Sequence, residues 1–232
     1  MTRAIEVSSL DKGFTLHLRG GVQLPVLNGF ALTVEVGECV ALRGPSGAGK
    51  STVLRCLYGN YRPDRGSISV RDGGAMVDVA NASPRDILAL RCSTLGYVSQ
   101  FLRVVPRVGA LDLVMEPARE RGLDAAQARE RAVTLLERLH IPERLWDLPP
   151  ATFSGGEQQR INIARGLVAE HPILLLDEPT ASLDAANRAS VVELVRAAKA
   201  RGATVVGIFH DREVRDAVAD RVLDLDTMGA AA

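Results

Sequence analysis

The 232-residue sequence lacks a hydrophobic run long enough to cross a bilayer. Its longest uninterrupted hydrophobic runs are four residues, as at 173–176, whereas a membrane-spanning helix needs roughly 20. Glu6 lies where a signal peptide would be apolar. We therefore expect a cytoplasmic protein, which would be peripheral to a membrane only if a partner holds it there.

Cysteine, aromatic residues and excess charge are also scarce. Cys39, Cys56 and Cys92 are odd in number, widely spaced and without a Cys-x-x-Cys pair, which argues against a disulfide framework and against a zinc site. Aromatic residues are 4% of the chain, and 28 Lys and Arg balance 28 Asp and Glu. A zero net charge argues against direct nucleic-acid binding but allows a small anionic ligand.

In the first hundred residues, the spacing of the apolar residues predicts mainly strands. Phe14, Leu16 and Leu18 alternate with polar residues, which is typical of half-exposed antiparallel strands. Residues 39–42 are instead a continuous apolar run before a glycine-rich turn. That pattern predicts a buried parallel strand followed by a helix.

In the rest of the chain, the spacing of the apolar residues changes twice. From about 101 to 170 the pattern is mainly helical, and from 173 onward apolar runs alternate with helical segments. Such alternation predicts parallel strands joined by crossover helices. A chain of this length buries roughly 70% of its unfolded surface or more, so we expect a single α/β domain that needs no metal or disulfide to hold its core.

Residues 44–51 have the pattern of a phosphate-binding loop, G-x-x-x-x-G-K-[ST], placed between an apolar strand and a helical run. Glycines let backbone N–H groups converge on phosphate oxygens, and the helix start adds its positive dipole end. Lys50 adds a point charge, and Ser51 is placed to ligate magnesium. The residues expected to bind nucleotide here are Gly44, Pro45, Ser46, Gly47, Ala48, Gly49, Lys50, Ser51 and Thr52.

Two carboxylates follow the apolar run 173–176. Asp177 is expected to emerge at the carboxyl end of a central strand, where open α/β sheets bind ligands, and to hold the magnesium shell. Glu178 can reach a water aimed at the terminal phosphate, which predicts a general base. Adjacent carboxylates at a strand end are common, so this pair gains its meaning from the phosphate loop.

Residues 154–158 read Ser-Gly-Gly-Glu-Gln before another predicted helix. Ser154 and Glu157 have the spacing of a capping box, which begins many helices. Gly155 and Gly156 each lower helix propensity by about 1 kcal/mol relative to Ala, a cost that makes sense if the backbone closely approaches an anion. The segment therefore predicts a second phosphate-facing helix start.

In this order, the phosphate loop, the 154–158 signature, Asp177-Glu178 and a histidine after the next strand resemble the ATP-binding subunits of ABC (ATP-binding cassette) proteins. The resemblance covers nearly the whole chain. It implies an α/β fold of the P-loop NTPase type, with a mixed parallel core sheet, an antiparallel β subdomain and an inserted helical subdomain. Residues 1–232 would be one ABC ATPase domain: 1–100 the β-rich and P-loop core, about 101–170 the helical signature subdomain, and about 171–232 the remaining core.

The resemblance also implies an activity, Mg²⁺-dependent hydrolysis of ATP, and roles for single residues. Phe14 matches the aromatic residue that stacks on adenine, although an ordinary core Phe is the alternative. Gln100 matches a glutamine that touches magnesium and water, His210 a switch histidine at the γ-phosphate, and Asp184 the loop joining two sites. The implied catalytic residues are Glu178, His210 and Gln100. The implied metal ligands are Ser51, Gln100 and Asp177. The nucleotide-binding residues outside the phosphate loop are Phe14, Ser154, Gly155, Gly156, Glu157 and Asp184.

Family geometry implies a head-to-tail homodimer. Each ATP would lie between the phosphate loop of one chain and residues 154–156 of the other, so that closure completes the site and hydrolysis reopens it. A bare cassette fills the 232 residues. We therefore expect the chain to drive another protein, received at residues 101–119 after Gln100.

Four segments, 22–28, 97–107, 141–146 and 207–211, resemble the L component of the bacterial carbon–phosphorus lyase system. This resemblance implies ATP hydrolysis in support of phosphonate breakdown, with the lyase assembly and its second cassette protein as partners. Carbon–phosphorus cleavage itself is not expected, because the sequence has no iron–sulfur cysteine cluster.

Two alternatives remain open. The leading one is the ATPase subunit of an ABC transporter of the lipoprotein-release or macrolide-export type, with a membrane permease as partner. The other is a soluble regulatory or nucleic-acid-associated ABC ATPase. It is disfavoured because such proteins usually carry a long insertion or two cassettes in one chain, and because no basic stripe is present.

Overall fold

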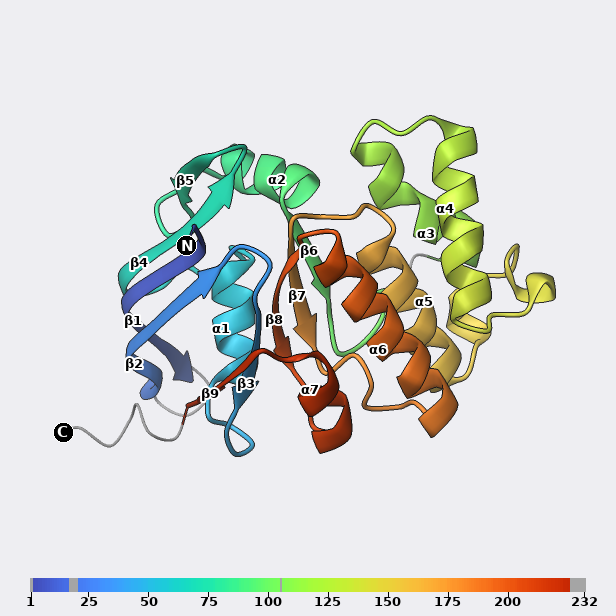
Figure 1. Cartoon of the computed structure of the whole chain (residues 1–232). Helices are drawn as coiled ribbons and strands as arrows, with labels where there is room; N and C mark the ends of the chain where they lie inside the picture. The colour runs from blue at the N-terminus through green and yellow to red at the C-terminus, as the bar shows by residue number, and fades with distance from the viewer. Residues whose placement is uncertain (1, 17–20, 105, 226–232) are drawn as a thin grey trace.

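A five-stranded sheet forms the centre of the protein, whose computed structural model describes residues 2–16, 21–104 and 106–225 (Figure 1). Its strands are β3 (Cys39–Arg43), β6 (Leu95–Val98), β7 (Ile173–Asp177), β8 (Thr204–Ile208) and β9 (Arg221–Asp224). Their spatial order is β6-β7-β8-β3-β9, and every described ladder is parallel. The carboxyl ends of all five strands therefore meet at one edge of the sheet.

A second, four-stranded sheet contains the remaining described strands. These are β1 (Arg3–Leu16), β2 (Val22–Glu35), β4 (Arg65–Asp72) and β5 (Ala75–Asp78), in the order β2-β1-β4-β5. All of their ladders are antiparallel. The alternation predicted around Phe14 is confirmed as a strand as far as Leu16, and Leu18 lies outside the described residues.

Helices cover the parallel sheet on both sides. They are α1 (Lys50–Leu57), α2 (Pro84–Ser93), α3 (Ala110–Glu120), α4 (Ala125–Arg138), α5 (Gly155–Leu167), α6 (Ala185–Ala200) and α7 (Arg212–Val218), with single 3₁₀ turns at η2 (Glu143–Leu145) and η3 (Pro150–Thr152). Helix α1 lies between the two sheets, whereas α5 and α6 cover the opposite face and α3 and α4 extend beyond them (Figure 1). Within the described residues, no helix combines the length and apolarity needed to span a membrane.

The parallel strands are apolar throughout because both of their faces are buried. In β7, Ile173 and Leu175 belong to the hydrophobic cluster shared with α1 and the antiparallel sheet. Leu174 and Leu176 belong to the cluster shared with α3 to α6. Since side chains alternate between faces along a strand, a strand between two cores reads as an uninterrupted apolar run.

Helix α2 was not predicted from the sequence, because the strand signals on either side of it dominated that region. Its local signals are nevertheless clear. Ser83 caps its N-terminus and forms a capping box with Asp86, and Pro84 occupies the first turn. Those three residues are a recognised helix-start pattern, so the sequence did contain the information.

Candidate functional site

The phosphate-type loop connects β3 to α1 at the carboxyl edge of the parallel sheet. Gly44, Gly47 and Gly49 have φ angles of 151°, 85° and 91°, which residues with side chains rarely adopt. A Cβ on Gly49 would also lie 2.8 Å from Leu27 Cδ2 of β2. The predicted glycines are therefore needed for both the turn and the close packing of the loop.

Lys50 extends back into this loop. Its Nζ donates to the carbonyl oxygens of Gly44 and Pro45, each at 2.7 Å, and the residue is only 8% exposed. Among the described residues it forms no ion pair with a carboxylate, so a buried positive charge lacks a counterion. The α1 N-cap, Gly49, also offers no side-chain acceptor to the first-turn N–H groups. Both features fit a polyphosphate.

Two of the three proposed magnesium ligands, Ser51 and Asp177, lie side by side although they are 126 residues apart in sequence. Ser51 Oγ donates to Asp177 Oδ1 at 2.9 Å, and Asp177 is 2% exposed. Tyr97 donates its hydroxyl to the other carboxylate oxygen at 3.0 Å, and burial together with this carboxylate raises the Tyr97 pKa. An all-oxygen pair suits Mg²⁺, which typically takes one or two protein ligands and completes its shell with phosphate and water.

Tyr97 was missed in the sequence. It is the third residue of β6, the strand that pairs with β7 in parallel register, and its Cα partner is Leu175. An aromatic hydroxyl near the carboxyl end of an apolar run just before Gln100 is the signal that could have revealed it. Only the strand order shows that this run lies next to Asp177.

The three proposed catalytic side chains also converge. Gln100 Nε2 donates to Glu178 Oε2 at 3.0 Å, and His210 Nε2 lies 2.7 Å from Glu178 Oε1. Glu178 has a φ of 54° and donates its backbone N–H to Ile208 of β8. This left-handed backbone turns the residue off the end of β7 and places its carboxylate between Gln100 and His210.

The signature residues begin α5 with the capping box that their spacing predicts. Ser154 donates its N–H and Oγ–H to Glu157 Oε2 at 2.9 and 2.7 Å, and Glu157 N–H donates back to Ser154 Oγ. These bonds lower the pKa of Glu157. A Cβ on Gly155 would meet open space, and one on Gly156 would lie 3.3 Å from Ser182 O. The helix start is thus accessible and lies beside the loop that contains Asp184.

Within the described part of the chain, no hydrogen bond joins residues 154–157 to the loop 44–51. The structure therefore brings together Ser51, Asp177, Gln100, Glu178 and His210, and leaves the signature residues with their own partners. Sequence order alone does not distinguish these two sets.

Two other predicted binding residues take local structural roles in this chain. Asp184 is exposed and caps α6, accepting a hydrogen bond from Asn187 N–H at 2.8 Å. Phe14 is half-buried on β1, with its ring edge-on to Tyr61 at a centroid distance of 5.2 Å and Lys12 Nζ 5.4 Å from its centroid.

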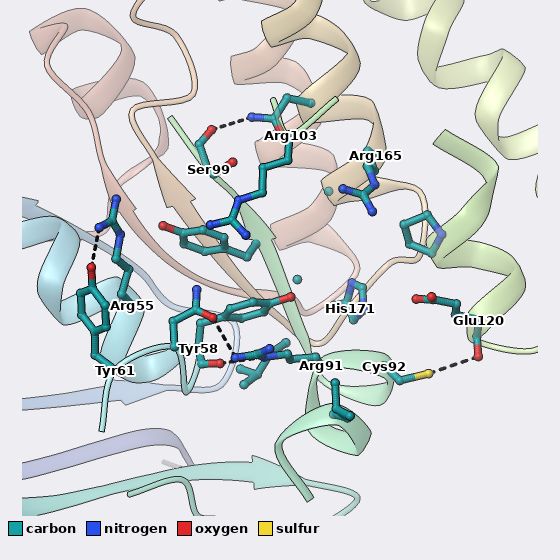
Figure 2. A pocket seen from close by; sticks show the side chains of 18 residues that line it. Arg55, Tyr58, Tyr61, Arg91, Cys92, Ser99, Arg103, Glu120, Arg165 and His171 are labelled. Atoms are coloured by element: carbon teal, nitrogen blue, oxygen red, sulfur yellow. Dashed lines mark hydrogen bonds between the residues drawn. The ribbon is translucent and has the colours of Figure 1, made fainter. Parts of the chain in front are cut away.

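A groove of about 990 Å³ lies beside these residues, between the core and the helices α3 and α5. Figure 2 shows labelled arginines around it, and Glu120 at the side of α3. Tyr58 and Tyr97 stack along its wall with ring centroids 4.9 Å apart. The cationic residues that line it are Arg55, Arg91, Arg103 and Arg165. The groove reaches the site through Tyr97, which bonds to Asp177, and Ser99, which precedes Gln100.

His171 also lines this groove, and the burial of its side chain should make the stability of the protein depend on pH. The residue is 6% exposed, its Nδ1 has no hydrogen-bond partner, and burial together with the charge of Arg121 lowers its pKa to about 4. Below pH 6.5 the unfolded chain binds a proton on His171, and the folded chain does not until about pH 4. The free energy of unfolding should therefore fall by up to about 3 kcal/mol between these pH values.

Replacing His171 by Gln is expected to flatten the pH dependence of stability in this window. Urea midpoints measured at intervals from pH 7 to pH 4.5 give the slope, which is informative even if the variant is less stable throughout. His140→Gln is the matched control, because it makes the same substitution at a histidine that is exposed rather than buried. An unchanged slope in His171→Gln would contradict the prediction.

Comparison with known proteins then gives the family. A family model described as ABC transporter matches residues 27–181, more than half of the chain, including the loop 44–51, the signature and both carboxylates. The chain belongs to the ABC transporter family. It is an ABC-type ATPase that uses ATP with Mg²⁺.

Curated relatives of this cassette have transporter names. An uncharacterized ABC transporter ATP-binding protein of Mycobacterium tuberculosis is 37% identical over 209 residues, which are 90% of this chain and 62% of that protein. A macrolide export ATP-binding/permease protein of Brucella abortus is 39% identical over 91% of this chain, which spans 32% of its length. A probable amino-acid ABC transporter ATP-binding protein of Haemophilus influenzae is 37% identical, with 94% of this chain and 82% of that protein aligned.

A solved structure supports the fold over almost the whole cassette. The dimeric structure of the ATP-binding cassette MJ0796 in a post-hydrolysis state, bound to ADP and phosphate, superposes with a TM-score of 0.86. Its sequence is 27% identical, and the match covers 95% of this chain and 93% of that one. The predicted α/β fold of the P-loop ABC type is confirmed.

Proposed function

We propose that this cassette is the ATP-hydrolysing subunit of an ABC transporter, acting as a head-to-tail homodimer beneath a membrane permease. The observation that carries the proposal is the position of the arginine-lined groove. A partner segment in the groove would touch Tyr97, whose hydroxyl holds Asp177, and Ser99, which immediately precedes Gln100. Docking and hydrolysis would then share residues.

At the hydrolytic site, Lys50 and the loop N–H groups would bind the β- and γ-phosphates. Ser51 and Asp177 would hold Mg²⁺, which neutralises developing charge on the phosphates when it is bound. Glu178 would accept the proton of the attacking water. Gln100 and His210, both within hydrogen-bond distance of Glu178, would orient that carboxylate and the water.

The second half of each site would come from the other chain. The start of α5 is accessible at Gly155 and carries a positive dipole end, so residues 154–157 can face the phosphates bound by a second copy. The solved relative MJ0796 is described as dimeric. In the same arrangement Asp184 would lie near the dimer contact, and Phe14 would stack on adenine. Residues 101–170 would form the helical signature subdomain.

The chemistry of the groove indicates what the permease presents there. Four guanidinium groups surround it, and Glu120 is the acidic residue among its lining residues in the described part of the chain. Arg165 is paired with Glu116, whereas Arg103 is exposed on the segment 101–119. A short segment with acidic and aromatic side chains would complement this surface. The cassette would accordingly be peripheral to the cytoplasmic face of the membrane.

A second candidate function rests on the four sequence segments that resemble the carbon–phosphorus lyase component. In that case the cassette would remain cytoplasmic, and its partners would be the soluble lyase assembly and a second cassette protein. The transporter names of the curated relatives favour the first candidate.

Affinity purification of the tagged chain distinguishes the two candidates. Cells would be grown with and without a phosphonate, and proteins bound to the chain in detergent-solubilised extracts identified by mass spectrometry. Recovery of an integral membrane permease is the expected result, and it should be lost in Arg103→Glu and kept in Arg129→Glu, an exposed charge reversal on α4. Recovery of soluble lyase proteins without a permease would refute the transporter proposal.

A further inference from the structure

We infer that Asn162 is a positioning residue that holds Gln100 in place for hydrolysis by binding the backbone immediately before it. Asn162 lies on α5 and is 5% exposed. Its Nδ2 donates to Ser99 O at 2.5 Å, which ties the signature helix to the segment that carries Gln100. The inference rests on the role proposed above for Gln100 at the hydrolytic site.

The close approach of α5 to β6 makes this bond possible. Gly166 lies one helical turn after Asn162 on the same face of α5. A Cβ on Gly166 would come well inside 3.0 Å of Val98 Cγ2, closer than real Cβ atoms approach other atoms. Because this position has no side chain, the helix packs directly on the end of β6, and the short side chain of Asn162 reaches the Ser99 carbonyl.

A second buried amide on α5 binds the other side of the site. Gln159 is 4% exposed, and its Nε2 donates to the carbonyl of Pro179 at 3.1 Å. Its Oε1 lies 3.4 Å from Asn162 Nδ2, so the two amides are neighbours. Pro179 is the residue after Glu178, and Ser99 is the residue before Gln100. Each amide of α5 therefore binds the backbone next to one residue of the hydrolytic site.

These contacts close a ring of hydrogen bonds around the hydrolytic pair. Gln100 binds Glu178 directly at 3.0 Å, and α5 binds the backbone next to each of them. The same helix begins at Ser154. Asn162 therefore connects the helix end that is proposed to face the nucleotide of the second chain with the glutamine that faces the nucleotide of its own chain.

Asn162→Asp tests the bond itself, because it keeps the shape of the side chain and replaces the donating amide with an acceptor. Facing the Ser99 carbonyl, this acceptor should displace Gln100 and lower kcat about tenfold, while the Kd for ATP changes less than about twofold. Asn81→Asp is the matched control, since Asn81 is exposed and, in the part of the chain that the structure describes, its amide binds the nearby Asp78 and not the site. It should leave kcat unchanged.

A double-mutant cycle decides whether Asn162 acts through Gln100. In the Gln100→Ala background, adding Asn162→Asp should lower kcat by less than about twofold, because the residue that it positions is already absent. Multiplying losses would overturn the inference, and so would full activity of either single variant. If Asn162→Asp does not fold, as judged by its melting temperature, Asn162→Ala replaces it in the same cycle. The assays use the isolated 232-residue chain, so they are independent of which partner it drives.

Discussion

Replacing Glu178 by Gln is expected to lower ATP turnover by about 10³-fold while ATP binding is retained, as the loss of a general base predicts. Glutamine keeps the size of the side chain and the unbranched Cβ that tolerates the φ of 54° at this position. It removes the negative charge and replaces one of the two carboxylate oxygens, which now face Gln100 Nε2 and His210 Nε2, with an amide NH2 group. The change therefore removes the proton acceptor with little disturbance of its surroundings.

Two measurements check this expectation. Steady-state phosphate release reports turnover, and gel filtration with ATP should show a dimer that persists, because bound ATP is no longer consumed. Glu193→Gln is a suitable control, since Glu193 is exposed on α6 and the same carboxylate-to-amide change there should leave turnover unaffected. Appreciable residual hydrolysis by Glu178→Gln would remove Glu178 as the base.

Replacing Lys50 by Ala is expected to weaken ATP binding by about 10²-fold. This factor corresponds to the roughly 2.7 kcal/mol that a hydrogen bond to a charged group contributes. The ammonium is the buried cation of the loop, and its partners in the described structure are the carbonyls of Gly44 and Pro45. Phosphate oxygens are far stronger acceptors for this group than neutral carbonyls. Its removal also frees the two loop carbonyls, which would then oppose an anion.

Isothermal titration calorimetry with ATP and Mg²⁺ measures this loss. Lys199→Ala provides the control, because Lys199 binds Val218 O and Asp220 at a different part of the sheet. That variant should bind ATP as the unsubstituted chain does, although it loses an ion pair. Unchanged affinity in Lys50→Ala would contradict the assignment of the loop.

Several elements were predictable because their signals are local. The loop 44–51, the capping box of α5 and the apolar run of β7 are each encoded within a few residues, and all three were predicted in the correct place. Helix α2 was equally local but was overlooked between strands. Tyr97 and Asn162 were not predicted, because their partners, Asp177 and the Ser99 carbonyl, lie far away in sequence and are brought to them only by the packing of β6 against β7 and α5.

The sequence by itself determined which chemical groups this protein has and their order: a phosphate loop, a signature helix start, two carboxylates and a histidine. Those features are local, since backbone conformation and helix capping depend on neighbouring residues. Only the tertiary structure decided which groups meet. Parallel pairing of β6, β7, β8 and β3 aligns their carboxyl ends, and this places Gln100 against Glu178 across 78 residues and Ser51 against Asp177 across 126.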